Sequence, residues 1–430
     1  MLIIGQVLVR EVLLVMSLSS HDSSVSGSMK TQHRAGDVRV LFIHASQDHL
    51  SAEYKVHKIF AESATAYGVE SHFVWQRGLQ STSDNTMVFP WPERVRYIDF
   101  GRDLSLGLHG GRLRRARMML RSMPSALRET ITYVRVIRPD LIYTSQQVYD
   151  VRVARFITQM TRVPHVIHIH YTVGKWLGGD VLRAIQKTPR LIAVSEFIRQ
   201  NAMLQGVSPT TVSTVPNPIS PEVFLQGSVQ EGDARAAMRA EFGWAPDTPV
   251  IIAAGRLDPM KGHHKLIEAF AALLTHVPHA RLLICGRTFN SSTYPDMLKR
   301  RVAELGIQHA VVFAGHRYDV AALMRAADVF SLLSEMEPFG LVFLEAMAAR
   351  LPVVAYYSGA VPEIVADGVT GLLSYPDQVE PLAHNMARLL SDRTLAAQMG
   401  KAGYERASST FSSTVIVPSW AAHLHRFAGC

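Results

Sequence analysis

The stretch that decides the fold is VIIAAGRLDPMKG, residues 250–262. Its first five residues are apolar and are predicted to form a buried strand, and a helical pattern begins after Gly262. Gly255 lets the backbone turn sharply, so that Arg256 and Lys261 emerge from one strand-to-helix loop. An anion held between a guanidinium and an ammonium would suit this loop, although two ordinary charges on a solvated loop would give the same pattern.

Short apolar runs alternate with helical patterns along the rest of the chain, which is typical of βα units and parallel sheets. The predicted strands are the apolar runs at 38–43, 139–143, 163–170, 191–195, 250–254, 281–285, 311–314, 329–333 and 352–356. A segment rich in proline, glycine and polar residues, 217–248, is predicted to be a domain linker with a short helix. We therefore expect two doubly wound α/β domains that bind ligands in the cleft between them, at the carboxyl ends of the strands.

The composition limits the class of protein. With 430 residues, of which 48% are hydrophobic, the chain suits a soluble α/β protein of two or three domains. The formal net charge of +8 favours anionic partners. Two cysteines, Cys285 and Cys430, are too few for a disulfide framework or a cysteine-rich metal site. This cysteine usage fits a reducing compartment, so we expect a cytoplasmic protein.

The first 36 residues stand apart from the predicted domains. Residues 2–18 look like a signal sequence, but Arg10 and Glu11 split the apolar run, which is also too short to span a bilayer. A second methionine, Met29, lies shortly before the first strand. We expect residues 1–36 to be a disordered extension or the product of a start codon assigned too early.

A second motif is EPFGLVFLEAMA, residues 337–348, which follows a predicted strand. Gly340 removes a side chain where backbone N–H groups would face a ligand, and a helix beginning there would offer unpaired donors to a diphosphate. Glu345 lies about a turn into this helix, where it could accept ribose hydroxyls, and Glu337 in the loop could hold sugar hydroxyls. Two surface glutamates are the plainer alternative, but the apolar neighbours of Glu345 argue against it.

A third segment, 358–365, closes another strand-to-helix turn and is followed by residues 367–373. Both stretches are interpreted as loop and cap sequences, and by themselves they indicate no function.

With these three segments in this order, the chain resembles the large retaining glycosyltransferase family 4, which has the GT-B fold. The resemblance is dense from residue 253 to residue 373 and thin before residue 139. It implies two Rossmann-like, doubly wound parallel-sheet domains that face each other across a cleft. Residues 37–216 would form the acceptor-side domain and 217–410 the domain that binds the nucleotide sugar. A C-terminal helix, 411–430, would pack back on the first domain.

The resemblance also implies a role for individual residues. Arg256 and Lys261, after Gly255, would bind the donor diphosphate. Glu337 would lie near the donor sugar and Glu345 on the ribose.

Five further positions match parts of the donor site in the family. Phe339, Gly340 and Leu341 would contribute backbone contacts to sugar and phosphate, and Arg317 would lie near the nucleobase. His170 matches a histidine that is hydrogen-bonded to the donor sugar, although a core histidine is the alternative. The residues assigned to catalysis are therefore His170, Glu337, Arg256 and Lys261.

The chain departs from the family pattern at three places. Arg350 stands where the family usually has a glycine, and Ala360 replaces the second glycine of the pair that begins at Gly359. The loop 45–51 contains no glycine, although the family usually has a pair there. These departures leave the base of the donor open between UDP and GDP, and they leave the acceptor open as well.

The 19 histidines do not predict a metal site. His168 and His170 share one face of a predicted strand, and His165 points to the other face. A zinc site needs ligands from at least one other element, and no such ligand spacing was found. We therefore expect no metal and no cofactor, with a UDP- or GDP-linked sugar as the substrate.

The arginine-rich segment 112–138 has apolar residues among its cations. A basic amphipathic helix on an anionic membrane surface would have this pattern, as would a solvated helix on the protein surface. Nucleic-acid binding is not expected, because no aromatic residues lie between the cations in 112–132. The protein would then be cytoplasmic, either free or peripheral on the inner face of the cytoplasmic membrane.

The expected reaction is metal-independent transfer of a sugar, with retention of configuration, from a nucleotide-diphosphate donor to a glycan, a lipid-linked or a small-molecule acceptor. Three alternatives stay open. They are a nucleotide-sugar epimerase of the same architecture, a pyridoxal-dependent phosphorylase, and a non-catalytic protein that binds a glycan, a lipid or a protein partner. The cation pair and the two glutamates argue against the last.

Overall fold

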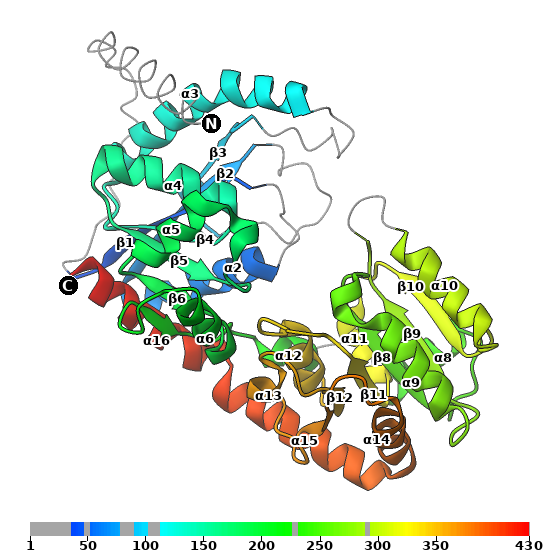
Figure 1. The fold of residues 1–430 in the computed structure, drawn as a ribbon. Coiled ribbons are helices and arrows are strands. Elements are labelled where there is room, and N and C mark those ends of the chain that lie inside the picture. Colours follow the sequence, from blue (N-terminus) through cyan, green and yellow to red (C-terminus); the bar gives the residue numbers. More distant parts are fainter. Residues whose placement is uncertain are drawn as a thin grey trace.

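The computed structural model describes residues 36–46, 52–77, 90–101, 112–225, 231–288 and 293–429, without the side chains of residues 52, 112–121 and 231–234. These residues form two lobes, each built on a parallel sheet (Figure 1). The predicted fold class is thereby confirmed. The expectation for residues 1–36 falls almost entirely outside the described residues, as does most of the loop 45–51.

The first lobe contains a seven-stranded sheet in the order β3-β2-β1-β4-β5-β6-β7. Its strands are β1 (Val38–His44), β2 (Val69–Gln76), β3 (Val95–Ile98), β4 (Leu141–Ser145), β5 (His165–Ile169), β6 (Leu191–Ala193) and β7 (Val212–Thr214). Its helices are α2 (Ala52–Ala64), α3 (Arg112–Ile137), α4 (Val148–Thr161), α5 (Gly179–Lys187), α6 (Glu196–Leu204) and α16 (Ser413–Ala428). All the strand pairs are parallel.

Alternate residues of β1 belong to two different hydrophobic clusters, one on each face of the sheet. Val40 and Phe42 pack in a cluster that includes apolar residues of α2 and α16. Leu41 and Ile43 pack in a second cluster, with residues of α3 and α4. This two-sided burial explains why consecutive residues 40–43 are apolar, rather than every second one.

Strand β2 was not predicted, because its sequence VESHFVWQ mixes polar and apolar residues although every residue in it is buried. Two of its polar side chains, Glu70 and His72, bind each other and residues of neighbouring elements, whereas Ser71 Oγ has no partner among the described residues. Glu70 accepts hydrogen bonds from Arg39 (3.0 Å) and His72 (2.6 Å), and the other ring nitrogen of His72 lies 2.9 Å from the hydroxyl of Tyr133. Burial alone would raise the pKa of Glu70, but the hydrogen bonds from His72 and Arg39 lower it to about 2.

The second lobe contains a six-stranded sheet in the order β10-β9-β8-β11-β12-β13. Its strands are β8 (Val250–Ala254), β9 (Arg281–Cys285), β10 (Val311–Gly315), β11 (Val329–Leu332), β12 (Val353–Tyr356) and β13 (Gly371–Ser374). Its helices are α7 (Pro221–Leu225), α8 (Glu231–Glu241), α9 (His263–Leu273), α10 (Tyr294–Glu304), α11 (Val320–Ala326), α12 (Leu341–Ala348), α13 (Val361–Ile364), α14 (Val379–Ser391) and α15 (Arg393–Thr410). Within 367–373, predicted to be a loop, residues 371–373 begin β13.

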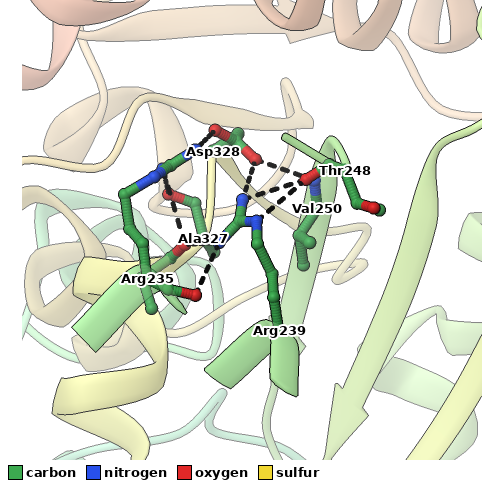
Figure 2. Close-up of polar contacts among 7 residues, drawn as sticks. Arg235, Arg239, Thr248, Val250, Ala327 and Asp328 are labelled. Atoms are coloured by element: carbon green, nitrogen blue, oxygen red, sulfur yellow. Dashed lines mark hydrogen bonds and ion pairs between the residues drawn. The ribbon is translucent and has the colours of Figure 1, made fainter. Parts of the chain in front are cut away.

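The segment 217–248 is not simply a linker, because α8 packs into the second lobe. Arg239 of α8 is 1% exposed, and its guanidinium donates to the carbonyl of Thr248 (3.0 and 3.1 Å) and to Asp328 (2.9 Å). Asp328 also pairs with Arg235 (2.7 Å) and accepts a hydrogen bond from the backbone N–H of Val250 (2.8 Å). Figure 2 shows these side chains converging beside the start of β8. We call Arg235, Arg239, Thr248 and Asp328 the guanidinium network.

The chain crosses between the lobes twice, and the two crossings lie side by side. The backbone N–H of Ile219 donates to the carbonyl of Phe411 (2.9 Å), and the N–H of Ser413 donates to the carbonyl of Ile219 (2.8 Å). After the second crossing, α16 packs on the first lobe (Figure 1). Trp420 of α16 is fully buried there and donates a hydrogen bond to the hydroxyl of Tyr143 (3.0 Å).

The described half of α3 explains the apolar residues of the arginine-rich segment. Leu127 and Ile131 are buried in the core of the first lobe, while Arg128 and Arg135 are exposed on the opposite side of the helix. Its apolar face is therefore occupied by the sheet. None of the helices in the described ranges is both long and apolar enough to cross a membrane.

Candidate functional site

An ion pair joins the loops that follow two neighbouring strands of the second sheet. Lys261, after β8, lies 2.7 Å from Glu337, after β11, and their side chains are 21% and 6% exposed. Strands β8 and β11 are hydrogen-bonded neighbours, so both loops leave the same carboxyl edge of the sheet. The structure thus brings together two of the predicted site residues, which are 76 positions apart in the sequence.

The loop that carries Lys261 is held by local capping and by one obligatory glycine. Asp258 caps the short 3-10 helix Pro259–Lys261 by accepting a hydrogen bond from the N–H of Met260 (3.0 Å). Gly262 follows with φ of +68°, and a Cβ there would meet the carbonyl oxygen of Leu333 at 2.0 Å. A side chain at position 262 would therefore push this loop away from β11.

The loop that carries Glu337 is held from the opposite side by the turn at 358–360. Ala360 donates its N–H to the carbonyl of Glu337 (2.8 Å), and Ser358 accepts a hydrogen bond from the N–H of Met336 (3.0 Å). Gly359 has φ of +59°, and a Cβ there would lie 2.4 Å from the backbone nitrogen of Glu337. Ala360 has a negative φ, which explains why an alanine fits where the family usually has a glycine.

Helix α12 begins directly after this loop. Its N-cap, Gly340, has φ of +95° in the left-handed region. Phe339 is buried and contacts the ring of Phe411 edge-on. Among the described residues, nothing accepts a hydrogen bond from the N–H groups of Leu341 and Val342, which are in the first turn. This helix end offers partial positive charge beside Glu337.

Glu345 lies one turn along α12, in a partly buried position. Burial raises the pKa of its carboxyl, and the charge of Lys55 on α2 lowers it in part. None of the described residues makes a hydrogen bond or ion pair with this carboxylate. Because Lys55 belongs to the first lobe, the carboxylate of Glu345 interacts electrostatically with a residue of the other lobe.

Two contacts that sequence reasoning missed fix the lobes to each other. Ser195, which follows β6, donates a hydrogen bond to the carbonyl of Pro338 (2.6 Å). Glu363 of α13 accepts hydrogen bonds from the N–H groups of Glu196 (2.8 Å) and Phe197 (2.7 Å), so a carboxylate of one lobe caps a helix of the other. The only sequence signal was an acidic residue in a turn, which does not identify a partner in another domain.

The structure places the other predicted cations differently. Arg256 lies 3.6 Å from Asp258 within its own loop, with about a third of each side chain exposed. Arg317 is clamped by two carboxylates, because four hydrogen bonds of 2.5–3.1 Å connect it to Glu241 and Asp319. The predicted contact of Arg317 with a nucleobase would therefore have to compete with these bonds.

Arg350 adopts the conformation for which the family usually has a glycine. Its φ is +57°, and its guanidinium lies over the ring of Tyr404, 5.1 Å from the centroid. The backbone there is left-handed whichever residue is present, and the arginine bears the conformational cost that a glycine would avoid.

His170 lies just after β5 in the first lobe, 6% exposed, and its Nε2 lies 3.2 Å from Nε2 of His57 on α2. His57 Nδ1 lies 3.3 Å from Nε2 of His44, at the end of β1. His168 is fully buried, with its ring centroid 4.0 Å from that of His170. We call these four residues the histidine cluster. Sequence reasoning missed it because His57 and His44 come from elements other than β5.

The parts just described form an arrangement that suits an anionic ligand with hydroxyl groups. Lys261 and the first turn of α12 supply positive charge at one edge of the second sheet, and the Glu337 carboxylate between them can accept hydrogen bonds. The hydrogen bond from Ser195 to Pro338 brings the carboxyl ends of the two sheets together at this point. A ligand with a diphosphate and a polyhydroxylated group matches these features.

Two family models match consecutive parts of the chain. The model described as "Glycosyltransferase Family 4" matches residues 60–223, and "Glycosyl transferases group 1" matches residues 234–406. The boundary between the two matches falls in the segment that connects the lobes.

Individual proteins resemble the chain over part or all of its length. It is 35% identical over 208 residues to a D-inositol 3-phosphate glycosyltransferase of Corynebacterium glutamicum, covering 47% of this chain and 49% of that protein. It is 36% identical over 194 residues to a GDP-mannose-dependent alpha-(1-6)-phosphatidylinositol monomannoside mannosyltransferase of Mycolicibacterium smegmatis, covering 43% of this chain and 50% of that protein. These matches span about half the length of the curated relatives.

A solved structure shows the same fold over nearly the whole molecule. Anabaena Alr3699/HepE, in complex with UDP and glucose, superposes with a TM-score of 0.73 at 21% identity. The superposition covers 90% of this chain and 99% of that protein.

Proposed function

Because the chain belongs to glycosyltransferase family 4 and has the GT-B fold, we propose that it transfers a sugar from a nucleotide-diphosphate donor to a hydroxyl acceptor. The observation that carries this proposal is the convergence of Lys261, Glu337 and the start of α12 at one sheet edge, opposite the carboxyl ends of β5 and β6. Arg256, from the same loop as Lys261, completes the proposed diphosphate site.

In the proposed mechanism, catalysis comes mainly from stabilising the leaving group. Cleavage of the bond between the sugar and the phosphate builds negative charge on the nucleoside diphosphate. Arg256, Lys261 and the N–H groups near Gly340 would meet this charge in a partly desolvated site. Binding of the diphosphate would draw Lys261 from Glu337, whose carboxylate would then accept hydrogen bonds from sugar hydroxyls. Glu345 would hold the ribose, and His170 the donor sugar from the first lobe.

We further propose that the configuration of the sugar is retained, by attack of the acceptor on the face that the diphosphate leaves. This proposal assigns no carboxylate of the described site as a covalent nucleophile, because Glu337 would hold sugar hydroxyls and Glu345 the ribose. No step in this scheme requires a metal ion. The product anomer, determined by NMR, tests retention directly.

The names of similar proteins guide the choice of substrates. One relative is named as GDP-mannose-dependent and a structural neighbour contains UDP and glucose, so both bases belong in a screen. The relatives named for D-inositol 3-phosphate and phosphatidylinositol mannoside favour a phosphorylated cyclitol or its lipid as the first acceptors to try. Glycan acceptors form the second group.

We also propose weak adsorption to anionic membranes through exposed arginines. Because the apolar side of the described half of α3 is buried against the sheet, the interaction would be electrostatic, through Arg128, Arg135 and Arg138. Cosedimentation with phosphatidylglycerol vesicles, but not with phosphatidylcholine vesicles, is expected at low salt. Equal binding to both lipids would contradict it.

Donor binding and the two cations test the main proposal. A thermal-shift screen of UDP-, GDP- and ADP-sugars should identify a donor, since a ligand at a hundred times its Kd stabilises the folded state by about 2.7 kcal/mol. With that donor, Lys261→Ala and Arg256→Ala should each lower turnover about a hundredfold. Lys401→Ala is the matched control, because Lys401 is an exposed lysine on α15. Near-normal transfer by both site variants would refute the assignment.

An epimerase of the same fold is the alternative with the clearest test. The same cations and helix end would bind the same donor, so binding alone does not separate the two activities. Incubation with the nucleotide sugar alone would produce a new nucleotide sugar if the protein were an epimerase. A transferase would give a glycosylated product only when an acceptor is present.

A further inference from the structure

The histidine cluster holds three ring nitrogens close enough to share one ion. His57, His168 and His170 each offer a nitrogen, and these nitrogens lie within 4.8 Å of one another in a buried position. The Nε2 atoms of His57 and His170 are 3.2 Å apart. Two nitrogens bound tetrahedrally to one zinc at about 2.0–2.1 Å would be separated by about 3.4 Å. The spacing of His57 and His170 therefore already suits an ion, and the nitrogen of His168 would have to move by up to about 1.4 Å to complete the site.

His168 lacks the hydrogen bonds that a buried imidazole normally has. Its side chain is 0% exposed, and neither Nδ1 nor Nε2 has a partner among the described residues. A buried polar group without a partner costs roughly 1–3 kcal/mol, and such groups in native structures call for a specific explanation. An ion bound to one nitrogen of His168 would interact with a lone pair that otherwise accepts no hydrogen bond.

His44 lies where it can orient His57 for this purpose. Its Nε2 is 3.3 Å from His57 Nδ1, so a proton on His57 Nδ1 would be donated to His44. The lone pair on Nε2 of His57 then points toward His170. A metal-bound histidine characteristically fixes its second nitrogen in this way.

The chemistry of the donor set selects a class of ion. The three candidate ligands are all imidazoles, and all three are buried. Imidazole ligands suit zinc and its neighbours in the first transition row, whereas magnesium and calcium require oxygen ligands. Three protein ligands leave a fourth position for water, as in open zinc sites.

We propose that His57, His168 and His170 bind one divalent transition-metal ion of the zinc class, with His44 as a positioning residue. The ion would link α2 to the end of β5, and so fix the helix that carries Lys55 opposite the second lobe. This site lies within the first lobe and shares His170 with the proposed donor site, but metal binding is measured without the transfer reaction. It also departs from the expectation, drawn from the sequence, that the protein has no metal.

The test uses the full chain, purified without a histidine tag and treated with a chelator. Zinc, cobalt, nickel and magnesium are added separately, and bound metal is measured after desalting by mass spectrometry. We expect one equivalent of zinc or cobalt per chain and no retained magnesium. The visible spectrum of the cobalt form should be that of a four-coordinate site. No retained zinc, or a cobalt spectrum typical of six-coordinate ions, would overturn the proposal.

Variants separate this site from adventitious binding. His168→Gln and His57→Gln should each weaken zinc binding more than about a hundredfold, since even outer-shell partners contribute about tenfold to a hundredfold. His44→Ala should weaken zinc binding by the smaller factor, about tenfold to a hundredfold. His263→Gln is the matched control, because His263 is a buried histidine of the second lobe whose nitrogens also lack partners but which stands apart from the cluster. Equal zinc affinity in all four variants would refute the assignment.

X-ray absorption of the zinc-loaded wild type should show three imidazoles, and this measurement decides the matter if the variants fail to fold.

Discussion

The guanidinium network and the histidine cluster are both buried groups of polar side chains, one in each lobe, but they differ in how well their hydrogen bonds are satisfied. Around Arg239, the N–H groups reach the carbonyls of Thr248 and Ala326 and the carboxylate of Asp328 (Figure 2). In the cluster, both nitrogens of His168 and the Nδ1 of His44 have no partner among the described residues.

This contrast separates a structural role from a binding role. A fully satisfied network in a low-dielectric interior rigidifies a fold, because any displacement breaks several bonds at once. The guanidinium network fits this description, since it fastens α8 to the starts of β8 and β11. In the histidine cluster, the unpartnered nitrogens lower the stability of the fold. Such a cost is expected where a ligand supplies the missing interactions.

Acidification should produce the largest difference between the two regions. Burial keeps the pKa of His57 at about 3 and holds those of His44, His168 and His170 well below 6.5. Below pH 6.5 the unfolded chain takes up protons that the folded chain does not, so stability present above pH 6.5 is lost as the pH falls. For His57 this loss is about 1.6 kcal/mol between pH 6.5 and pH 5, and the other three histidines lower the stability in the same direction.

Hydrogen-exchange protection factors in β5 and β8 at pH 7 and pH 5 measure this effect lobe by lobe. Protection in β5 should fall further than protection in β8. Parallel losses in the two strands would mean that the cluster does not control the acid response of the first lobe.

The substitution Asp328→Asn should have the next largest effect, in the other lobe. It keeps the shape of the side chain but leaves the buried guanidinium of Arg239 without its counter-charge, which costs about 3–5 kcal/mol. Urea denaturation should show this loss, with exchange in β8 affected and exchange in β5 unchanged. Glu241→Gln, at an exposed ion pair of the same helix, serves as the control and should cost less than about 1 kcal/mol. Equal losses of stability in the two variants would show that the guanidinium network contributes no more than an exposed ion pair.

The smallest effect, and one of opposite sign, is expected for His168→Leu in metal-free protein. A leucine of similar size removes a buried polar group that has no partner, so the free energy of unfolding should rise by about 1 kcal/mol. Added zinc should stabilise the wild type and not this variant. A large destabilisation of the metal-free variant would show that His168 already makes a favourable interaction.

Much of the fold followed from apolar patterns, because most strands that are buried on both faces contain a continuous apolar run. Strands β8 and β9 were predicted with the bounds that the structure has, whereas β2 was missed. Its polar residues are paired with Arg39 and Tyr133, which lie far away in the sequence. Local periodicity contains no information about such partners.

The candidate site was predictable to the extent that it consists of loops with their own motifs. Lys261 and Glu337 were identified from two separate strand-to-helix turns, and the neighbouring positions of β8 and β11 bring them together. Glu363 was not identified, because its partner is a helix N-terminus in the other lobe. The convergence of His57 with β5 was missed for the same reason, since it depends on how α2 lies across the sheet.

The return of α16 to the first lobe has a consequence for the order in which the protein is made. Trp420 fills the core of that lobe against Phe60 and Tyr143, although it is synthesised after the entire second lobe. A nascent chain on the ribosome therefore cannot complete its N-terminal lobe until residues 413–428 have left the exit tunnel. A premature stop codon after residue 410 would remove Trp420 and so damage the half of the molecule that was translated first.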